Sequence, residues 1–216
     1  MVRRLIVAAM SAFALMVAAG VAQAHTPILF VHGYKESSTL WKTMIANFEK
    51  DGWTKAELNN WTYNTAQSNA TTAKEVATKV SEIKSKTGAA KVNLITHSMG
   101  ALSTRYYIKN LGGESTVEDW VSLGGPNHGT TTANFCFETS CVEMRPSSTF
   151  LNALNEGDET PGAVRYGTWW SPCDEIINPH TSVILTGATN TETECISHTA
   201  LTTNALVYSQ VREFVR

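Results

Sequence analysis

The sequence of 216 residues contains no long run of basic residues and no internal repeat, linker or low-complexity segment. Its 17 basic and 19 acidic residues give a net charge of −2, so no concentration of cations is available to neutralise phosphates, and we expect no nucleic-acid partner. The chain also lacks a C-x-x-C pair and any His/Cys spacing typical of zinc, so we expect neither a metal ion nor another cofactor. After residue 24 no apolar stretch reaches membrane-spanning length, which predicts no integral membrane segment there.

The first 24 residues have the pattern of a secretory signal peptide. Arg3 and Arg4 precede an apolar run over residues 5–21, and Ala22-Gln23-Ala24 matches an A-x-A cleavage site. An uncleaved membrane anchor stays open as an alternative, because the apolar run approaches spanning length. We expect cleavage after Ala24, a single domain over residues 25–216, and a secreted protein, either extracellular or periplasmic.

Cysteine is scarce but even in number, which in an exported protein favours two disulfides over free thiols. The four residues are Cys136, Cys141, Cys173 and Cys195. Of the three pairings that four cysteines allow, we expect Cys136 with Cys141 and Cys173 with Cys195. The second pair would join two loops that carry candidate catalytic residues.

Strand-length apolar runs alternate with amphipathic helical patterns, which predicts an α/β fold with a mostly parallel sheet. Strands are expected at residues 27–31, 56–63, 92–97, 117–123, 164–170 and 182–186. Helices are expected at residues 40–48, 73–87, 99–110, 147–154 and 201–215. The segment between residues 131 and 145 reads as a polar, irregular loop and is the only candidate for a flap.

The strongest chemical signal is the stretch from Val92 to Gly100, in which an apolar strand ends at Ser98 and a helical segment follows. A serine at such a turn is typical of a nucleophile elbow, where its hydroxyl is exposed above the sheet. Thr96 replaces the commoner first glycine of the G-x-S-x-G pattern, while Gly100 is retained. We therefore predict Ser98 to be a nucleophile, and the N–H of Met99 to face the substrate.

An earlier strand ends in His32-Gly33, followed by Tyr34. A glycine here lets the chain turn so that the N–H of Tyr34 can point into the site, as one of the two donors that an acyl-transfer oxyanion needs. We predict that His32 is a structural hydrogen-bonding residue and not a proton carrier.

An acid and a base follow the serine in the order Ser98, Asp174, His198, which is the chain order of α/β-hydrolases. Asp174 comes just after a predicted strand that Ser171-Pro172 breaks, where a carboxylate that orients the base is expected. Glu175 is its most credible rival. His128 directly follows the strand after the serine, which argues against it as the base.

At these motifs the chain resembles the small, lidless, secreted bacterial lipases of the Bacillus lipase A type, within the class 2 lipases. The resemblance rests on His32-Gly33, on residues 96–100 followed by residues 106–111, on residues 123–125, and on the spacing of Asp174 and His198. It implies a minimal α/β-hydrolase with helices on both faces of the sheet and no large lid domain. It also implies a triad of Ser98, Asp174 and His198, with the N–H groups of Tyr34 and Met99 as the oxyanion hole. Those lipases lack the cysteine pattern seen here.

The sequence thus predicts a secreted, monomeric carboxylic-ester hydrolase that acts through an acyl-enzyme and shows no marked interfacial activation. One alternative is a polyester depolymerase, because Tyr34, Trp169 and Trp170 follow or end strands near the predicted site and would stack on a flat substrate. Core packing is the other explanation of these aromatic residues, and we favour it. A non-catalytic binding protein on the same scaffold is a further alternative.

Overall fold

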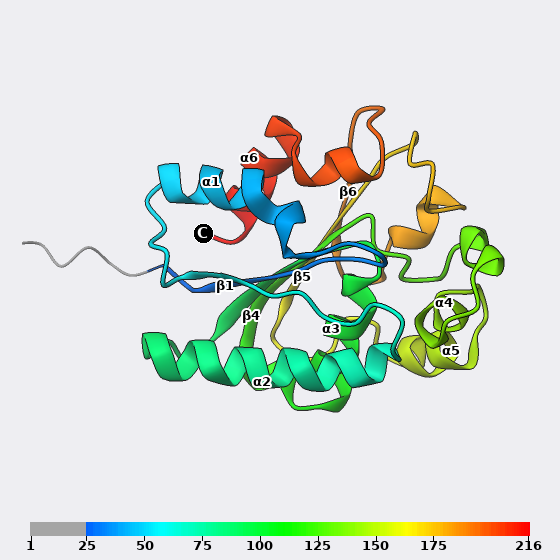
Figure 1. The fold of residues 1–216 in the computed structure, drawn as a ribbon, viewed down its shortest axis with the longest axis horizontal. Helices are drawn as coiled ribbons and strands as arrows, with labels where there is room; N and C mark the ends of the chain where they lie inside the picture. The colour runs from blue at the N-terminus through cyan, green and yellow to red at the C-terminus, as the bar shows by residue number, and fades with distance from the viewer. Residues whose placement is uncertain (1–24) are drawn as a thin grey trace, which may run out of the picture.

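The computed structural model describes residues 25–216, and the predicted signal peptide lies outside them. A six-stranded sheet runs through its centre in the order β2-β1-β3-β4-β5-β6, with every neighbouring pair parallel (Figure 1). The strands are β1 (Ile28–Val31), β2 (Leu58–Asn60), β3 (Val92–His97), β4 (Val117–Leu123), β5 (Arg165–Trp170) and β6 (Thr189–Glu192). Because all strands are parallel, their carboxyl ends meet at one edge, where α/β folds build their sites.

Helices cover both faces of the sheet, with α1 and α6 on one face and α2 and α3 on the other (Figure 1). The α-helices are α1 (Lys42–Lys50), α2 (Asn69–Thr87), α3 (Gly100–Asn110), α4 (Thr139–Glu143), α5 (Thr149–Asn155) and α6 (Ala205–Phe214). The longest helix, α2, begins and ends where the local chemistry favours it. The Ser68 side chain caps α2 by accepting from the N–H of Ala70, and Gly88 ends that helix with a left-handed φ of 73°. No helix within residues 25–216 combines the length and the apolar composition needed to cross a bilayer.

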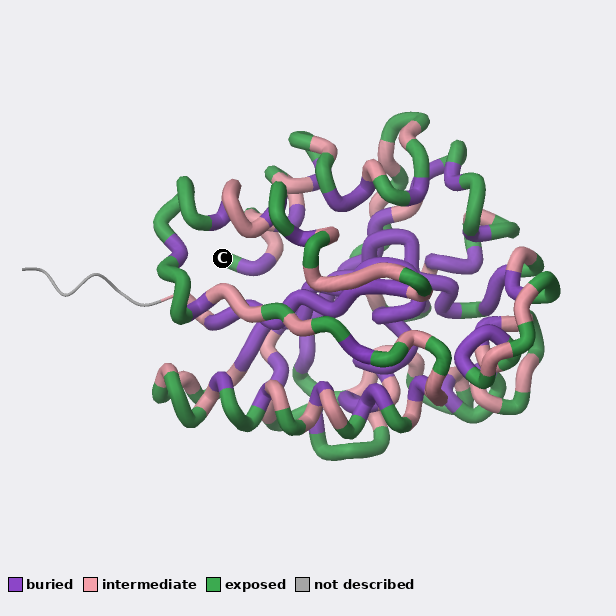
Figure 2. Tube along the Cα trace, viewed as in Figure 1, coloured by how far each residue is buried: buried purple, intermediate pink, exposed green. Residues whose placement is uncertain are grey.

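The central strands β1, β3 and β4 are buried on both sides, which explains why they read as largely apolar runs (Figure 2). Alternate residues of β1 belong to different cores: Leu29 and Val31 pack towards α2 and α3, whereas Ile28 and Phe30 pack towards α1 and α6. This two-sided burial fixes the register of the sheet, since a slip of one residue would exchange the two faces.

The predicted last strand at residues 182–186 is wrong. A 3-10 helix (His180–Val183) and a loop occupy this segment, and the edge strand is β6, further along the chain. Val183 and Leu185 are buried, but their carbonyl groups accept hydrogen bonds from the side chains of Asn127 and Asn190, at 2.7 and 2.9 Å. In this segment, side-chain amides therefore provide the hydrogen bonds that a neighbouring strand would otherwise donate to these carbonyl groups. β6 is polar and mostly exposed at the sheet edge, so it carries no apolar signal.

Two other segments also differ from expectation. Residues 131–145, predicted to be irregular, contain a 3-10 helix (Thr131–Phe135) and α4. The expected final helix at 201–215 starts later, as α6, after a 3-10 turn (Thr199–Thr202). Asn204 separates the two because its side chain accepts from the N–H groups of Leu206 and Val207 and so caps α6. Two further 3-10 turns are Ser38–Trp41 and Gly113–Ser115.

Candidate active site

Ser98 lies in the sharp turn between β3 and α3. Its φ is 54°, a left-handed conformation that is uncommon for a residue other than glycine and typical of functional sites. The N–H of Ser98 donates to the carbonyl of Leu123 at 2.9 Å, which anchors the turn to β4. A Cβ on Gly100 would come within 2.6 Å of the carbonyl oxygen of Val31. A glycine is therefore needed two residues after the serine for the turn to pack on β1.

Thr96, in place of the commoner first glycine of the elbow, is accommodated without disturbing the turn. It is buried, and its hydroxyl donates to the carbonyl of Val121 at 2.7 Å. The threonine therefore uses its polar atom to tie the end of β3 to β4.

His198 and Asp174 form a buried pair on loops that follow β6 and β5. The Nδ1 of His198 lies 2.7 Å from Oδ2 of Asp174, while the N–H groups of Ile176 and Ile177 donate to Oδ1 at 2.9 and 2.8 Å. The carboxylate is thus held on both oxygens. Because Nδ1 donates to it, Nε2 of His198 is the ring nitrogen left to accept a proton.

The surroundings set the charge of both groups. Burial lowers the pKa of His198 below its ordinary value of 6.5, and the charge of His97 lowers it further, against the opposing effect of Asp174. Burial tends to raise the pKa of Asp174, but the hydrogen bond and charge of His198 outweigh it, so that this pKa lies below 3.8. At neutral pH the pair is therefore a neutral imidazole beside a carboxylate, which is the form a general base requires.

Two backbone N–H groups are available for an oxyanion next to Ser98. Within residues 25–216, the N–H groups of Tyr34 and Met99 have no protein acceptor. Met99 precedes the first turn of α3, where the helix dipole favours negative charge. A Cβ on Gly33 would lie 2.6 Å from Cβ of Ser98, so only glycine lets the Tyr34 loop come this close to the serine.

Ser98 and His198 open into one pocket of about 300 Å³. Its walls are largely apolar and include Ala133, Met144, Ile176 and Ile177. Tyr34 and Glu36, on the loop after β1, also line it. The pocket therefore offers an apolar space beside a serine, an imidazole and two unpaired N–H donors.

The rival residues lie elsewhere or do other work. Oε2 of Glu175 accepts from the backbone N–H of His198 at 3.0 Å, so it holds the loop of the base and not its ring. His128 is exposed and pairs with Glu159 at 2.6 Å, outside the pocket. Nδ1 of the buried His32 lies 3.0 Å from the carbonyl oxygen of Gly33, and its ring stacks on Tyr63 with 4.2 Å between ring centres.

Among the aromatic residues considered for stacking on substrate, Trp169 is only 2 % exposed and packs in the core beside α6. Its Nε1 donates to the side chain of Gln210 at 2.9 Å. The interpretation of Trp169 as a core residue is thus confirmed. Tyr34 does line the pocket.

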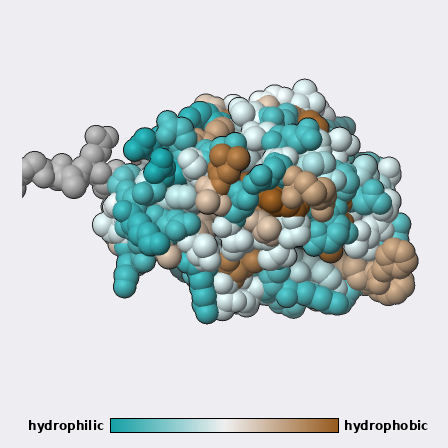
Figure 3. All heavy atoms as spheres, turned by 90° about the horizontal axis from the view of Figure 1, so that it is seen from above, coloured by the Kyte–Doolittle hydropathy of each residue, from teal (hydrophilic) through white to brown (hydrophobic). Residues whose placement is uncertain are grey.

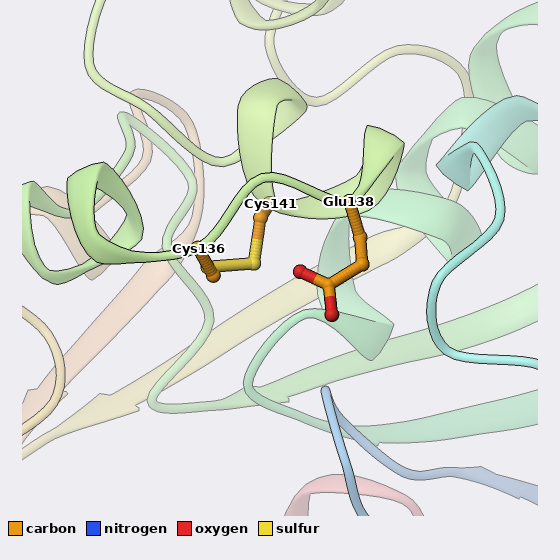
Figure 4. A group of neighbouring side chains, drawn as sticks. All are labelled: Cys136, Glu138 and Cys141. Atoms are coloured by element: carbon orange, nitrogen blue, oxygen red, sulfur yellow. A yellow bond between two sulfur atoms is a disulfide. The ribbon is translucent and has the colours of Figure 1, made fainter.

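Both predicted disulfides are confirmed. Cys173–Cys195 joins the Asp174 loop after β5 to the His198 loop after β6, and Cys136–Cys141 closes a short loop at the pocket. Glu138 lies within 4.8 Å of the latter two sulfur atoms, a cluster that resembles a metal site (Figure 4). The sulfur atoms are bonded to each other and offer no thiolate, so this cluster lacks the ligands that a zinc site needs.

The sequence analysis missed two exposed aromatic residues next to Cys136, which lines the pocket. Phe135 and Phe137 flank Cys136 and are 87 % and 82 % exposed. A light brown patch is visible in this region, at the right-hand edge of Figure 3, the end of the molecule where α4 lies. The segment had been described as polar. The pattern Phe-Cys-Phe beside a second cysteine indicates a loop closed by a disulfide, but it does not show that the two rings are exposed.

Glu36 and His97 are also close to the site and were not predicted as functional residues. Oε2 of Glu36 accepts from the N–H of Gly33 at 2.6 Å and lies 2.9 Å from Nδ1 of His97. The available signals were a glutamate three residues after Gly33 and a histidine directly before Ser98 at the end of a buried strand.

A parallel sheet with helices on both faces, a strained serine after β3 and no large lid in the described residues define a minimal α/β-hydrolase fold. The chain belongs to the class 2 lipase family, whose sequence model matches residues 25–205. The resemblance seen in the sequence is therefore confirmed.

Solved structures agree on the fold. The mature form of lipase BlEst2 from Bacillus licheniformis is 18% identical, with a TM-score of 0.79 over 89% of this chain and 93% of that one. Aspergillus fumigatus lipase B is 16% identical, with a TM-score of 0.71 over 87% of this chain and 51% of that one. A gene product of Listeria innocua is 13% identical, with a TM-score of 0.69 over 89% and 94% of the two chains.

Proposed function

We propose that this protein is a secreted serine carboxylic-ester hydrolase of the lipase and esterase type. One observation carries the proposal: Ser98 opens into the same pocket as His198, whose Nδ1 lies 2.7 Å from a fully hydrogen-bonded Asp174 carboxylate. A serine, a neutral imidazole and an orienting carboxylate are the three groups needed to activate a hydroxyl. Membership of the class 2 lipase family supports ester hydrolysis as the reaction.

In the first half of the reaction, Oγ of Ser98 attacks the ester carbonyl while Nε2 of His198 takes the serine proton. The tetrahedral oxyanion accepts hydrogen bonds from the N–H groups of Tyr34 and Met99. The bond to the alcohol then breaks, and His198 gives its proton to the departing alkoxide. The products are a free alcohol and an acyl group esterified to Ser98.

In the second half, water replaces the alcohol. His198 removes a proton from the water, which attacks the acyl-serine carbonyl, and the same two N–H groups hold the second oxyanion. Collapse releases the carboxylic acid and returns the proton to Oγ of Ser98. Asp174 stays ionised throughout and stabilises the imidazolium in both halves.

The pocket supports an apolar acyl chain, because Ala133, Met144, Ile176 and Ile177 line it. Polyester hydrolysis is the less supported alternative, since Trp169 lies in the core and is withdrawn from any stacking role. Two disulfides are compatible with an oxidising location outside the cytoplasm, and we propose an extracellular or periplasmic monomer.

Hydrolysis of p-nitrophenyl esters of increasing acyl length, an emulsified triglyceride and a polyester film tests this function. We expect activity on the soluble esters and the emulsion, and a loss on the order of 10⁴- to 10⁶-fold in turnover for Ser98→Ala. The variant should keep its circular dichroism spectrum. If pure Ser98→Ala protein keeps more than a few per cent of the activity, the serine mechanism is wrong.

A further inference from the structure

Glu36 and His97 connect the two loops that would have to act together in catalysis. Oε2 of Glu36 accepts from the N–H of Gly33 at 2.6 Å, directly before the proposed oxyanion donor Tyr34. The same oxygen lies 2.9 Å from Nδ1 of His97, and Nε2 of His97 lies 3.1 Å from the carbonyl oxygen of His198. One continuous chain of contacts therefore runs from the oxyanion loop to the backbone of the base.

The partners of His97 define its protonation. The His198 carbonyl can only accept, so Nε2 of His97 carries a hydrogen. Burial tends to raise the pKa of Glu36, but the hydrogen bond and charge of His97 and the N–H of Gly33 outweigh it, so that Glu36 is ionised. A carboxylate also only accepts, which leaves Nδ1 of His97 as a second donor. Both ring nitrogens then carry a hydrogen, and the ring is an imidazolium.

The pair is enclosed. The His97 side chain is fully buried and that of Glu36 is 20% exposed. The titratable groups that face His97 are Glu36, His198, with 4.5 Å between ring centres, and His32. A charged histidine at this depth requires a close counter-ion, and Glu36 is the carboxylate in contact with it.

We propose that Glu36 and His97 are positioning residues that lock the oxyanion loop to the base loop, with His97 held between them as an imidazolium. This inference rests on the proposed ester hydrolysis. The bridge sets the distance between the N–H of Tyr34 and Ser98, because Gly33 is fixed by Glu36 on one side and contacts the serine on the other. The bridge between Glu36 and His97 therefore stabilises the oxyanion in the transition state. Binding of the ester in the apolar pocket does not depend on this bridge.

Glu36→Gln is the direct test, because it keeps the size of the side chain and removes its charge. Glu57→Gln is a matched control. Oε2 of Glu57 is buried, accepts from the N–H of Thr54 at 2.6 Å and lies 3.9 Å from Nδ1 of His25, but it lies outside the active-site pocket. Both changes thus neutralise a glutamate that is at least partly buried, holds a backbone N–H and neighbours a histidine.

Single-turnover release of p-nitrophenol separates the acylation rate constant from ester binding. Removing an oxyanion donor typically costs on the order of 10²- to 10³-fold, and displacing one should cost less, so we expect about 10- to 100-fold slower acylation for Glu36→Gln. Its ester dissociation constant should stay within about two-fold of the wild type. His97→Gln should slow acylation similarly, and the double variant should lose little more than either alone. Glu57→Gln should acylate at the wild-type rate.

An acylation rate for Glu36→Gln equal to that of Glu57→Gln, or an equal loss in rate and binding, would overturn the inference. Nitrogen-15 NMR of histidine-labelled protein gives a second readout that does not need activity. We expect one histidine whose two ring nitrogens both donate hydrogen bonds, a signal absent in His97→Gln and changed at Nδ1 in Glu36→Gln. A singly protonated His97 in the wild type contradicts the bridge. If the wild type did not hydrolyse esters, the proposed function would be refuted. The NMR signal of His97 would still test the contact between Glu36 and His97.

Discussion

The loop closed by Cys173–Cys195 and the loop closed by Cys136–Cys141 both border the pocket, yet they are built differently. The first cross-link spans 22 residues and joins the ends of two strands, with Asp174 next to one cysteine and His198 near the other. The second spans five residues, and its neighbours Phe135 and Phe137 extend into solvent. One disulfide therefore lies beside the buried Asp174 and His198 of the proposed triad, and the other lies beside two exposed phenylalanine rings.

Polar contacts reinforce the first loop. The buried hydroxyl of Ser171 donates to the carbonyl of Ile196 at 2.6 Å and accepts from the N–H of the same residue at 3.0 Å. Glu175 accepts from the N–H of His198. The acid and base loops would thus keep part of their arrangement without the cross-link.

Arg145 helps to hold the second loop. Nε and Nη2 of Arg145 donate to the carbonyl groups of Ala133 and Cys136, at 3.2 and 2.9 Å, and its guanidinium lies 5.8 Å from the ring centre of Phe137. The comparison teaches that a disulfide can position catalytic groups across strands or shape a local surface. The two uses should respond differently to mutation.

The largest effect is expected from Asp174→Asn, which removes the carboxylate inside the first loop. An amide in this place can stabilise the wrong imidazole tautomer, so we expect a loss of about 10⁴-fold in kcat at neutral pH with little change in melting temperature. Glu175→Gln is the neighbouring control and should have little effect, because its amide oxygen can still accept from the N–H of His198. The reverse result would assign the orienting role to Glu175.

The next largest effect is expected from removing each disulfide in turn, and the two double variants should differ in melting temperature and in kcat. In the loop-entropy model the 22-residue span contributes about 3 kcal/mol and the five-residue span about 2 kcal/mol. Cys173→Ser/Cys195→Ser should therefore lower the melting temperature by about 6–12 °C and also reduce kcat. Cys136→Ser/Cys141→Ser should have a smaller thermal effect and leave kcat on a soluble ester nearly unchanged. If both double variants changed kcat equally, the two disulfides would not differ in their effect on catalysis, and the comparison would be wrong.

A smaller effect is expected in the pH dependence of kcat/KM, which reports the pKa of His198. Burial lowers the pKa of His198 below 6.5, so the base stays neutral into mildly acidic solution. The midpoint of the acid limb of kcat/KM should lie below pH 6.5, and activity should fall only as the pH drops through this lowered pKa. Cys173→Ser/Cys195→Ser should move the midpoint back towards 6.5 by loosening the burial of His198, whereas the other double variant should not. A wild-type midpoint above 6.5 would contradict the burial of the base.

The smallest effect on chemistry is expected from the exposed rings. Phe135→Ser/Phe137→Ser should leave kcat/KM on a soluble p-nitrophenyl ester within about two-fold, since both rings lie in solvent. It should reduce adsorption to emulsified triglyceride several-fold by removing apolar contact area. Leu206→Ser, at an exposed apolar position on α6, is the control and should adsorb like the wild type. Unchanged adsorption of the double phenylalanine variant would show that this surface does not contact lipid.

The elements that the sequence predicted well are those buried on both sides. β1 and β3 read as apolar runs because their alternate residues pack into opposite cores. Ser98 could be located because a strand of this kind ends directly before it. β6 was missed because an exposed edge strand carries no such pattern, and residues 182–186 misled because their apolar side chains enter the core from a loop.

Long-range contacts set the limit for the site. The order of Ser98, Asp174 and His198 could be read from the chain, but the link between Glu36 and His97 joins positions 61 residues apart. No sequence pattern around Glu36 or His97 indicates that the two residues are in contact. The rings of Phe135 and Phe137 were overlooked because hydrophobic residues are expected to be buried, and only the fold shows these two to be exposed.

Covalent labelling tests the central claim, that Ser98 is a nucleophile activated by His198 and Asp174, most directly. The protein would be treated with a fluorophosphonate. Mass spectrometry of the intact protein would count the adducts, and peptide mapping would locate them. We predict a single adduct on Ser98, none in Ser98→Ala, and labelling slowed by orders of magnitude in Asp174→Asn. An adduct on another residue, or an unlabelled protein that still hydrolyses esters, would contradict the account.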